Sequence, residues 1–407
     1  MITILKIAWR NIWRNKLRSS IVIISIILGI WSGLFISALT LGMNEQRTKN
    51  IISTSLSHLQ IHNKTFLANL NIKDTINSPQ IDLNACKSNK MIKAYTGRQI
   101  AAGMIANAKG NYGIQLYGIN PETEKKVTAI FSKIEKGNYF TRLKRNPIVL
   151  GKELAKKMNA KLNSKVVVTL QNINGDLVNG AFRVEGIYNA ENSTLELSTA
   201  FVKIEDLAKI TGLSKNTLHE IALLGNNIKN APLIKKDLEK VDKTNKIETW
   251  AEISPALSYA QAMMSKFLYI FMVVILLALS FGIINSMLMA VLERKKEIGM
   301  LMAVGMKKRK IFSMISYETL FLSLIAAPVG LLFAYITIKY FSIHGIDLSI
   351  FSSGLASFGM GTIIYTYLPT NIYFEITFLT IIIAFISSLF PARRALKLNP
   401  AEAVKSL

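Results

Sequence analysis

The sequence predicts an α-helical membrane protein with four transmembrane helices plus a large mixed α/β extracytoplasmic domain. Four apolar stretches are each long enough to cross a hydrocarbon core of roughly 30 Å at about 1.5 Å per residue. Basic residues flank three of these stretches, which predicts an orientation. A long polar segment with strand-like and helix-like patterns separates the first stretch from the second. These three observations define the fold class.

Composition supports the membrane class and argues against nucleic-acid binding. Of 407 residues, 50% are hydrophobic and 18% are charged, and the mean hydropathy is +0.32. The net charge is +24, but the basic residues are scattered and form no dense stripe outside the membrane flanks. Cys86 is the only cysteine, so we expect no intrachain disulfide and no cysteine-based metal site.

The predicted parts of the chain follow from the ends of the apolar stretches. Glu318, about two turns into the third span, is expected to face protein or the membrane interface. The sequence leaves open whether the loop before span four rests on the membrane or packs on the outer domain. The parts are 1–20 (interfacial elbow helix), 21–42 (span one), 43–266 (extracytoplasmic domain with helical stalks), 267–292 (span two), 293–310 (cytoplasmic segment), 311–340 (span three), 341–371 (short extracytoplasmic loop), 372–390 (span four) and 391–407 (cytoplasmic tail).

The positions of Lys and Arg predict the sidedness. Basic residues precede spans one and three and follow span four, and the 341–371 loop has none. The positive-inside rule therefore places both termini and the 293–310 segment in the cytoplasm, and the large domain in the periplasm. The flanking residues are Lys6, Arg10, Arg14, Lys16, Arg18, Lys307, Lys308, Arg309, Lys310, Arg393, Arg394 and Lys397.

The elbow carries two neighbouring rows at four-residue spacing, as a helix lying on the membrane would. Tryptophan at the headgroup level, beside arginine facing lipid phosphate, is typical of an interfacial helix. A plain basic flank would need the charges but not the tryptophan spacing. The apolar row is Leu5, Trp9, Trp13 and Leu17, and the cationic row is Lys6, Arg10, Arg14 and Arg18.

Small residues recur at the same spacing in spans one and two. In lipid, such rows let helix backbones approach closely. We therefore expect spans one and two to meet, within the chain or across a dimer. The rows are Ser25, Gly29, Gly33 and Ser37 in span one, and Ala278, Gly282, Ser286 and Ala290 in span two.

The segment 43–266 has the alternating pattern of a mixed α/β domain. Strand-like runs include HLQIH, VVVTLQ, AFRVEGIY, TAFVKI and EIALLG, and helix-like runs include ELAKKMNAKL and PLIKKDLEKV. Asn174-Gly175 and Asn179-Gly180 predict turns. Residues 43–55 and 255–266 are expected to be helical and continuous with spans one and two.

No catalytic set is recognisable in the sequence. HExxH, GxSxG and GxxxxGK[ST] are absent, and Gly151-Lys152 is followed by Glu. His58 and His62 are four residues apart, but in a strand they would stand about 13 Å apart, too far to share a metal. We therefore expect no catalysis, no metal and no bound cofactor in this chain.

The segment VLERKKEIGMLMAVGMKKRK, residues 291–310, joins spans two and three. The segment has mixed charges, an apolar middle with two glycines and four consecutive basic residues. A simple connecting loop would not need such a pattern. ER-x-x-EIG (293–299) followed by Ala303-Val304-Gly305 closely resembles the cytoplasmic segment of the FtsX-like permease superfamily, which includes the LolC/LolE and MacB permeases. The Trp9-Arg10-Asn11 start, with Trp13 and Arg14, resembles the elbow of that family. Other matching segments are Ile148–Gly151 with Leu154-Ala155, Val184–Ile187, Pro391–Ala395 and Asn399–Ala403.

The resemblance implies the permease subunit of a mechanotransmission ABC transporter, in which residues 293–305 form a coupling helix. That helix would dock on a separate ATPase subunit, present in two copies, which binds the ATP and Mg²⁺. A second permease chain, the same or related, would complete the dimer. The candidate coupling residues are Glu293, Arg294, Lys295, Lys296, Glu297, Ile298, Gly299 and Gly305.

The resemblance leaves the cargo open. Lipoprotein release from the inner membrane is favoured, partly because this chain begins at the elbow without a fused ATPase, as LolC/LolE do. A lipoprotein substrate or a periplasmic carrier would then be a partner. Ile247–Glu252 with Pro255 also looks closer to LolC/LolE. MacB-like efflux of a drug, peptide or toxin and FtsX-like control of a cell-wall hydrolase are the alternatives. A receptor without an ATPase would leave the 293–305 pattern unexplained.

Overall fold

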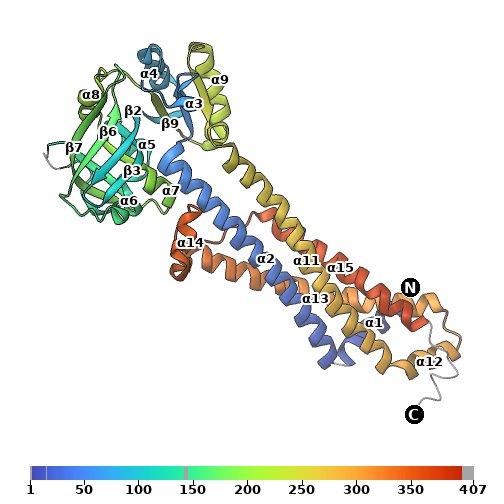
Figure 1. The fold of residues 1–407 in the computed structure, drawn as a ribbon. Coiled ribbons are helices and arrows are strands. Elements are labelled where there is room, and N and C mark those ends of the chain that lie inside the picture. The colour runs from blue at the N-terminus through green and yellow to red at the C-terminus, as the bar shows by residue number, and fades with distance from the viewer. Residues whose placement is uncertain (1, 15, 142–144, 397–407) are drawn as a thin grey trace. The chain divides into compact units, whose positions relative to one another are not determined.

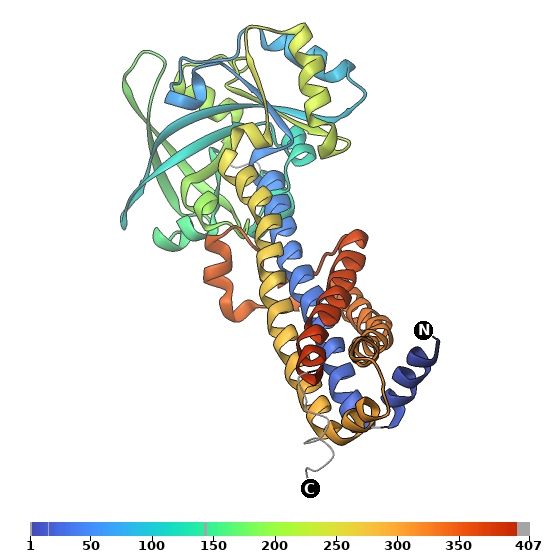
Figure 2. The ribbon, with the colours of Figure 1, turned by 90° about the vertical axis from the view of Figure 1, so that its right-hand side faces the viewer.

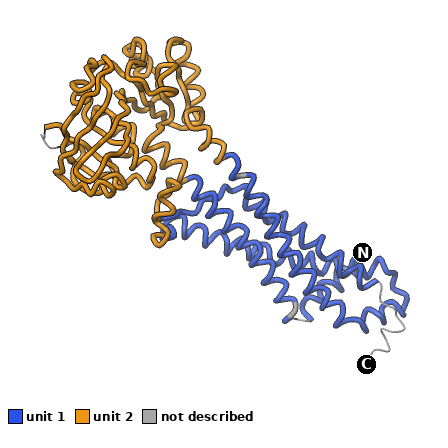
Figure 3. The backbone as a smooth tube through the Cα atoms, viewed as in Figure 1, with its two compact units in different colours: residues 1–45, 262–347, 363–407 blue, residues 46–261, 348–362 orange. Residues whose placement is uncertain are grey.

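The computed structural model describes residues 2–14, 16–141 and 145–396, which form two compact units (Figures 1 and 3). The membrane unit comprises residues 1–45, 262–347 and 363–407, and the outer unit comprises residues 46–261 and 348–362. The C-terminal motif at 399–403 and Lys397 lie outside the described residues, so they stay predictions.

The membrane unit is helical. Among the described residues, four helices (α2, α11, α13 and α15) are long and apolar enough to cross a membrane. They contain the four predicted spans. The helices are α1 (Ile2–Arg14), α2 (Lys16–Ile51), α11 (Pro255–Glu293), α12 (Lys295–Ala303), α13 (Lys308–His344) and α15 (Thr370–Leu396), where α2 and α11 continue into the outer unit.

The core of the membrane unit lies where four long helices converge. Ile26 and Ile30 of α2, Ile283 of α11 and Ala326 of α13 are buried there. Helix α13 packs along α15 and α1. Glu318, the acidic residue of span three, is buried within protein, which confirms that it does not face lipid.

The outer unit contains one ten-stranded sheet and short helices. The strands are β1 (Leu59–His62), β2 (Ile92–Asn107), β3 (Gly110–Ile119), β4 (Ile134–Gly137), β5 (Pro147–Gly151), β6 (Lys165–Gln171), β7 (Leu177–Tyr188), β8 (Thr199–Lys203), β9 (Glu220–Gly225) and β10 (Lys246–Thr249). The helices are α3 (Phe66–Asn69), α4 (Pro79–Ser88), α5 (Pro121–Val127), α6 (Lys152–Lys157), α7 (Ser193–Ser198), α8 (Ile204–Thr211), α9 (Ala231–Val241), α10 (Trp250–Ile253) and α14 (Ser352–Ser357). The π-helix η1 (Ile52–Leu56) and the 3-10 helices η2 (Ile130–Lys133), η3 (Ile228–Asn230) and η4 (Ser349–Phe351) complete the unit.

Part of the sheet closes on itself. The pairings run β2–β3–β8–β5–β7–β6 and return from β6 to β2, with β3–β8 and β5–β7 parallel and the others antiparallel. Alternate side chains of these strands point inward and form one apolar core, as in a small barrel. Its buried members include Ile105, Leu116, Ile148, Val168 and Phe182.

Strand β4 pairs with β7 of the barrel, and the remaining strands β1, β9 and β10 form a second lobe. Strand β1 lies between β9 and β10, and β9 pairs with the first half of β2, all antiparallel. Helices α4 and α9 lie side by side and cover this lobe (Figure 2). Leu59, Ile61 and Leu223 from the strands meet Ile234 and Leu238 of α9 in its core.

Strand β2 joins the two lobes, and a buried ion cluster sits at the junction. Arg98 of β2 donates through Nη2 and Nε to Glu124 of α5, at 2.7 and 3.1 Å, and through Nη1 to Glu220 of β9, at 2.5 Å. All three side chains are buried. A buried charge is tolerated only when it is paired and hydrogen-bonded. Because Arg98 pairs with two carboxylates, it links both α5 and β9 to β2.

Two local predictions for the outer unit need correction. Asn179-Gly180 is not a turn but lies inside β7, where Gly180 pairs with Val168. A Cβ at Gly180 would stand 2.3 Å from Ile210 Cδ1, so the glycine serves close packing of α8 rather than chain reversal. The helix predicted from ELAKKMNAKL is shorter, because α6 ends at Lys157 and Asn159 adopts a positive φ of 50°. Asn174-Gly175 does form the β6–β7 turn, with Gly175 at φ 98°.

A pair of carboxyl groups fastens α4 to the loop before β10. Asn245 Nδ2 donates to Asp82 Oδ2 at 2.9 Å and to Asp242 Oδ2 at 2.6 Å. Burial, followed by the nearby charge of Asp242, raises the pKa of Asp82 to about 7. Hydrogen bonds from Thr244 and Asn245 outweigh partial burial and keep the pKa of Asp242 below its ordinary value. Asp82 is therefore the member of the pair that carries the proton.

This pair predicts a pH dependence of stability. The pKa of Asp82 is higher in the folded unit than in the unfolded chain, so its contribution is complete below the unfolded pKa of about 4 and disappears as pH rises through about 7. In Asp82→Asn, a neutral amide replaces the protonated acid. We expect the thermal unfolding midpoint of the full chain to fall less between about pH 5 and pH 8 in this variant than in the wild type.

The matched control is Asp176→Asn, which changes an exposed aspartate in the β6–β7 turn. It should retain the pH dependence of the wild type. If Asp82→Asn lost as much stability as the wild type over this range, the assignment of the proton to Asp82 would be wrong.

Candidate functional site

The predicted coupling segment forms a short helix between two long ones. Helix α11 ends at Glu293, α12 covers Lys295–Ala303 and α13 begins at Lys308. Gly305, at φ 92°, makes the turn between α12 and α13. The Met306 amide donates to the Leu301 carbonyl at 2.9 Å and closes this turn. Glycine adopts such a φ at little cost, which explains why a glycine occupies position 305.

An ion network holds α12 against the membrane unit. Arg294 Nε donates to Glu297 Oε2 at 2.9 Å, and Arg294 Nη1 donates to Glu318 Oε2 at 3.2 Å. Arg14 of the elbow donates to the same Glu297 oxygen. The Glu318 side chain is only 4% exposed, so Arg294 supplies the counter-charge that makes its burial tolerable. The network connects α1, α12 and α13.

Glu297 is ionised within this network. Partial burial would raise its pKa, but hydrogen bonds from Arg14 and Arg294 outweigh burial and hold the pKa below its ordinary value. The carboxylate therefore keeps its negative charge near neutral pH and accepts hydrogen bonds from both arginines.

The faces of α12 separate the predicted coupling residues into two groups. Ile298 and Gly299 are buried, and Ile298 joins the core of the membrane unit. Arg294 and Glu297 point into the ion network, so they support the helix rather than form its free surface. Glu293, Lys296 and Gly305 are exposed, and Lys295 is half-buried.

The exposed face of α12 carries apolar side chains that the sequence interpretation did not single out. Lys296, Met300 and Val304 follow one another at four-residue spacing, so they lie along one face. Met300 is 53% exposed and Val304 is 89% exposed. The four-residue spacing was the signal that could have identified them. A lysine beside two exposed apolar groups is suited to a protein interface.

The elbow is a separate helix, α1, that packs on α13. Ala8, Asn11 and Ile12 are buried, which adds an inward row to the predicted rows. The predicted elbow is too long, because α1 ends at Arg14 and the last members of both rows, Leu17 and Arg18, belong to α2. Trp9 and Trp13 are exposed, and Trp9 also contacts Phe321 edge to face, with ring centroids 5.6 Å apart. Arg10 and Arg14 are exposed beside them. This arrangement suits an interfacial helix, with the tryptophans and Arg10 exposed toward lipid, while Arg14 pairs with Glu297.

The two rows of small residues differ in their surroundings. In span one, a Cβ on Gly29 would stand 2.9 Å from Leu279 of α11, and one on Gly33 would stand 3.7 Å from Ile376 of α15. The span-one row therefore packs within the chain. In span two, Ala278 and Gly282 are exposed, and a Cβ at Gly282 would meet nothing within 4 Å. Gly29 touches span two through Leu279, so spans one and two meet within the chain, but not row against row.

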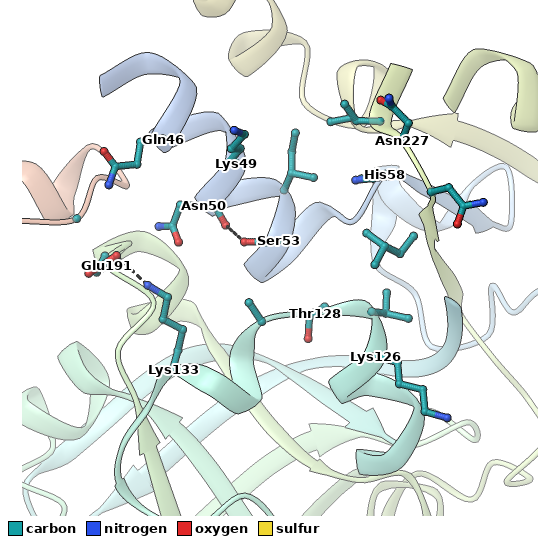
Figure 4. A pocket seen from close by; sticks show the side chains of 17 residues that line it. Gln46, Lys49, Asn50, Ser53, His58, Lys126, Thr128, Lys133, Glu191 and Asn227 are labelled. Atoms are coloured by element: carbon teal, nitrogen blue, oxygen red, sulfur yellow. Dashed lines mark hydrogen bonds and ion pairs between the residues drawn. The ribbon is translucent and has the colours of Figure 1, made fainter. Parts of the chain in front are cut away.

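The outer unit contains a cleft of about 790 Å³ beside the end of α2 (Figure 4). Lys133 Nζ pairs with Glu191 at 2.9 Å, and Ser53 Oγ donates to the Asn50 carbonyl at 3.1 Å. Burial lowers the pKa of His58, and its Nδ1 accepts from the Gly225 amide at 3.1 Å. These groups are engaged in pairs and backbone contacts, and the arrangement does not form a nucleophile with an adjacent base. The cleft is further lined by Gln46, Lys49, Ile52, Lys126, Val127, Thr128, Ala129, Leu224, Asn226, Asn227, Ile228 and Gly361.

The two histidines considered as a metal pair contact different groups, and only one of them lies in the strand. His62 is the last residue of β1, and its Nε2 lies 3.3 Å from Glu248 Oε2. His58 precedes the strand and contacts β9. Among the described residues, no three His, Cys, Asp or Glu side chains could hold a metal together.

Comparison with known proteins places both units among transporters. A family model described as the MacB-like periplasmic core domain matches residues 19–241, and one described as the FtsX-like permease C-terminal matches residues 269–400. The lipoprotein-releasing system transmembrane protein LolC of Buchnera aphidicola subsp. Schizaphis graminum is 26% identical over 97% of each chain. The macrolide export ATP-binding/permease protein MacB of Chlorobium luteolum is 24% identical over 98% of this chain and 59% of that protein. The crystal structure of the periplasmic region of MacB from Actinobacillus actinomycetemcomitans is 15% identical and covers 52% of this chain and 97% of that one, with a TM-score of 0.36.

The ion network gives a test of how α12 is held. In Arg294→Met, the buried carboxylate of Glu318 loses its counter-charge, which costs about 3–5 kcal/mol in comparable buried pairs. We expect a lower thermal unfolding midpoint for the full chain in detergent. Lys296→Met, on the exposed face of the same helix, should leave the midpoint unchanged.

A second substitution separates charge burial from lost packing. In the double variant Arg294→Met with Glu318→Gln, no unpaired charge remains, and most of the lost stability should return. A single variant as stable as Lys296→Met, or a double variant no better than the single one, would contradict the role given to Arg294.

Proposed function

Because the chain belongs to the ABC transporter permeases with a MacB-like periplasmic core and an FtsX-like C-terminal region, we propose that it drives lipoprotein release from the inner membrane. A separate ATPase would dock on α12 and supply the energy of ATP hydrolysis. Two permease chains and two ATPase subunits would form the working transporter, with both chain termini and α12 in the cytoplasm. This chain would bind no nucleotide or metal itself.

The observation that carries the proposal is the construction of α12. One face offers Lys296, Met300 and Val304 to a partner. Arg294 ties the start of the helix to α13, and Glu297 ties the helix to α1. A push on the exposed face is therefore transmitted to the long helices instead of being absorbed by a loose loop. A coupling element needs both properties together.

Two helices are long enough to carry that movement out of the membrane. Helix α2 has 36 residues and α11 has 39, which correspond to about 54 and 58 Å at 1.5 Å per residue. A hydrocarbon core is roughly 30 Å thick. Each helix therefore extends well beyond its span without a break, and both enter the outer unit. The substrate would then be moved by the outer units and would not need a channel through this chain.

The cargo is assigned from the relatives. A protein named for a lipoprotein-releasing system aligns with this chain over 97% of both lengths. MacB-like export is the second candidate, because a macrolide exporter aligns over 98% of this chain. Cells depleted of this chain separate the two: retention of lipoproteins in the inner membrane supports release, whereas macrolide sensitivity with normal lipoprotein sorting supports export.

The docking face gives a direct test in the full complex. An aspartate at Val304 would bury an unpaired charge in the proposed contact, so Val304→Asp should weaken ATPase retention about tenfold or more in a mild-detergent pull-down. Glu297→Lys leaves this face intact but loses the pairs with Arg14 and Arg294. It should retain the ATPase while abolishing substrate-linked ATP turnover.

The control is Leu177→Asp, which places the same charge on an exposed position of the outer unit. It should retain the ATPase as the wild type does. Full ATPase retention by Val304→Asp would exclude α12 as the docking face, and normal coupled turnover in Glu297→Lys would exclude its role in transmission.

A further inference from the structure

The loop between α13 and α15 has an unusual composition for a segment of the outer unit. It contains β11 (Ile346–Asp347), the 3-10 helix η4, helix α14 and β12 (Ile363–Ile364). From residue 348 to residue 374 the sequence has no Asp, Glu, Lys or Arg. The loop is therefore compatible with an environment that excludes charged groups.

Large apolar side chains stand exposed on this loop. Ile350 is 93% exposed, Phe351 is 63% exposed and Phe358 is 62% exposed. Single exposed apolar residues are common on protein surfaces. Three within nine positions of an uncharged loop form a patch, which indicates contact with something other than water.

The neck of the loop is fixed to the membrane unit. Strands β11 and β12 pair with each other, and the Leu348 amide donates to the Thr362 carbonyl at 2.8 Å. Beyond β12, Thr366 Oγ1 donates to the Ile338 carbonyl of α13 at 2.8 Å, and the Tyr367 amide donates to the Ala38 carbonyl of α2 at 3.0 Å. The loop thus leaves and re-enters the membrane unit at one place.

The chain length from the neck limits where the patch can be. Ile350 is three residues after Asp347, and Phe358 is five residues before Ile363. At no more than about 3.5 Å per residue, these side chains stay within roughly 10 and 18 Å of the neck. This bound depends only on the covalent chain, so it holds for any placement of the outer unit.

The end of the predicted third span places the neck near the expected level of the lipid headgroups. The predicted third span ends at Tyr340, and α13 continues for only four residues to His344, about 6 Å at 1.5 Å per residue. Tyr340, Tyr365 and Tyr367 are exposed around the neck. Tyrosine is enriched at this level because its ring is apolar and its hydroxyl is polar.

The other side of the loop is occupied by the outer unit. Leu355 is buried, α14 contacts α7, and the Gly359 carbonyl accepts from Asn50 Nδ2 at 3.3 Å. The loop therefore has one face that packs on protein and one that does not. The exposed apolar patch belongs to the second face.

We propose that Ile350, Phe351 and Phe358 insert into the outer leaflet of the membrane, so that the partner of this surface is lipid. The loop then attaches the outer unit to the bilayer surface at a point independent of the two long helices. It acts as a fixed point while α2 and α11 move. The proposal requires only the membrane spans and does not depend on the cargo.

The test uses the full chain in nanodiscs of phosphatidylethanolamine and phosphatidylglycerol. Phe351→Cys and Phe358→Cys are labelled separately with the environment-sensitive fluorophore NBD. Cys86 is buried and stays unlabelled. Both phenylalanines are exposed, so neither substitution removes a buried contact. We expect blue-shifted emission at both positions and quenching by shallow doxyl-labelled lipid at least about twofold stronger than at a water-exposed site.

The water-exposed site is Leu177→Cys, which is exposed in the outer unit at the start of β7. Lipid with the doxyl group near the end of the acyl chain should quench positions 351 and 358 less than shallow doxyl lipid does. Emission and quenching equal to those at 177 would overturn the proposal. Blue-shifted emission without quenching by doxyl lipid would also overturn it, because the patch would then be covered by protein, such as a second copy of this chain.

Discussion

The ion pairs of the Arg294 guanidinium are the interaction on which the end of the membrane unit around α1 and α12 depends. Arg294 neutralises a carboxylate, Glu318, that is nearly inaccessible to water, and it orients a second, Glu297, toward the elbow. Ion pairs at a surface contribute little to stability, whereas removing one partner of a buried pair leaves a charge that the interior cannot solvate. The position of α12 relative to α13 and α1 is therefore specified by charge and not only by apolar contact. Apolar contact alone would allow the short helix to slide.

A similar buried cluster of arginine and glutamate lies at the junction between the two lobes of the outer unit. Arg98 stands between Glu124 and Glu220, where strand β2 passes from the closed barrel to the second lobe. In the outer unit, one arginine and two glutamates join β2, α5 and β9. In the membrane unit, Arg14 and Arg294 with two glutamates join α1, α12 and α13. The planar guanidinium suits this task, because it offers several donors in fixed directions and stays charged in a buried site. Each cluster fixes a geometry that apolar packing leaves adjustable.

The sequence revealed what depends on local pattern. The four spans, the strand runs such as HLQIH and EIALLG and the turn at Asn174-Gly175 follow from length, alternation and turn chemistry, and the structure contains them. The turn predicted at Asn179-Gly180 is wrong because tertiary packing, and not chain reversal, requires this glycine. Ile210, thirty positions later, occupies the space of a side chain. Similarly, the motif at 293–299 predicted a coupling segment but did not indicate which of its residues are exposed. Partners such as Glu318 and Arg14 determine which residues of the motif point inward. The local sequence pattern does not indicate that these partners lie nearby.

The outer unit is assembled from two separate pieces of chain, 46–261 and 348–362. During synthesis from the N-terminus, the first piece is complete before α11 and α13 have been made. The Asn50 amide then has no Gly359 carbonyl to donate to, and Glu191 lacks the backbone of Gly361 against which it packs. These contacts form only once α11 and α13 have also been made. The outer unit therefore completes its structure only after the membrane helices between its two pieces have been made, so its folding depends on theirs.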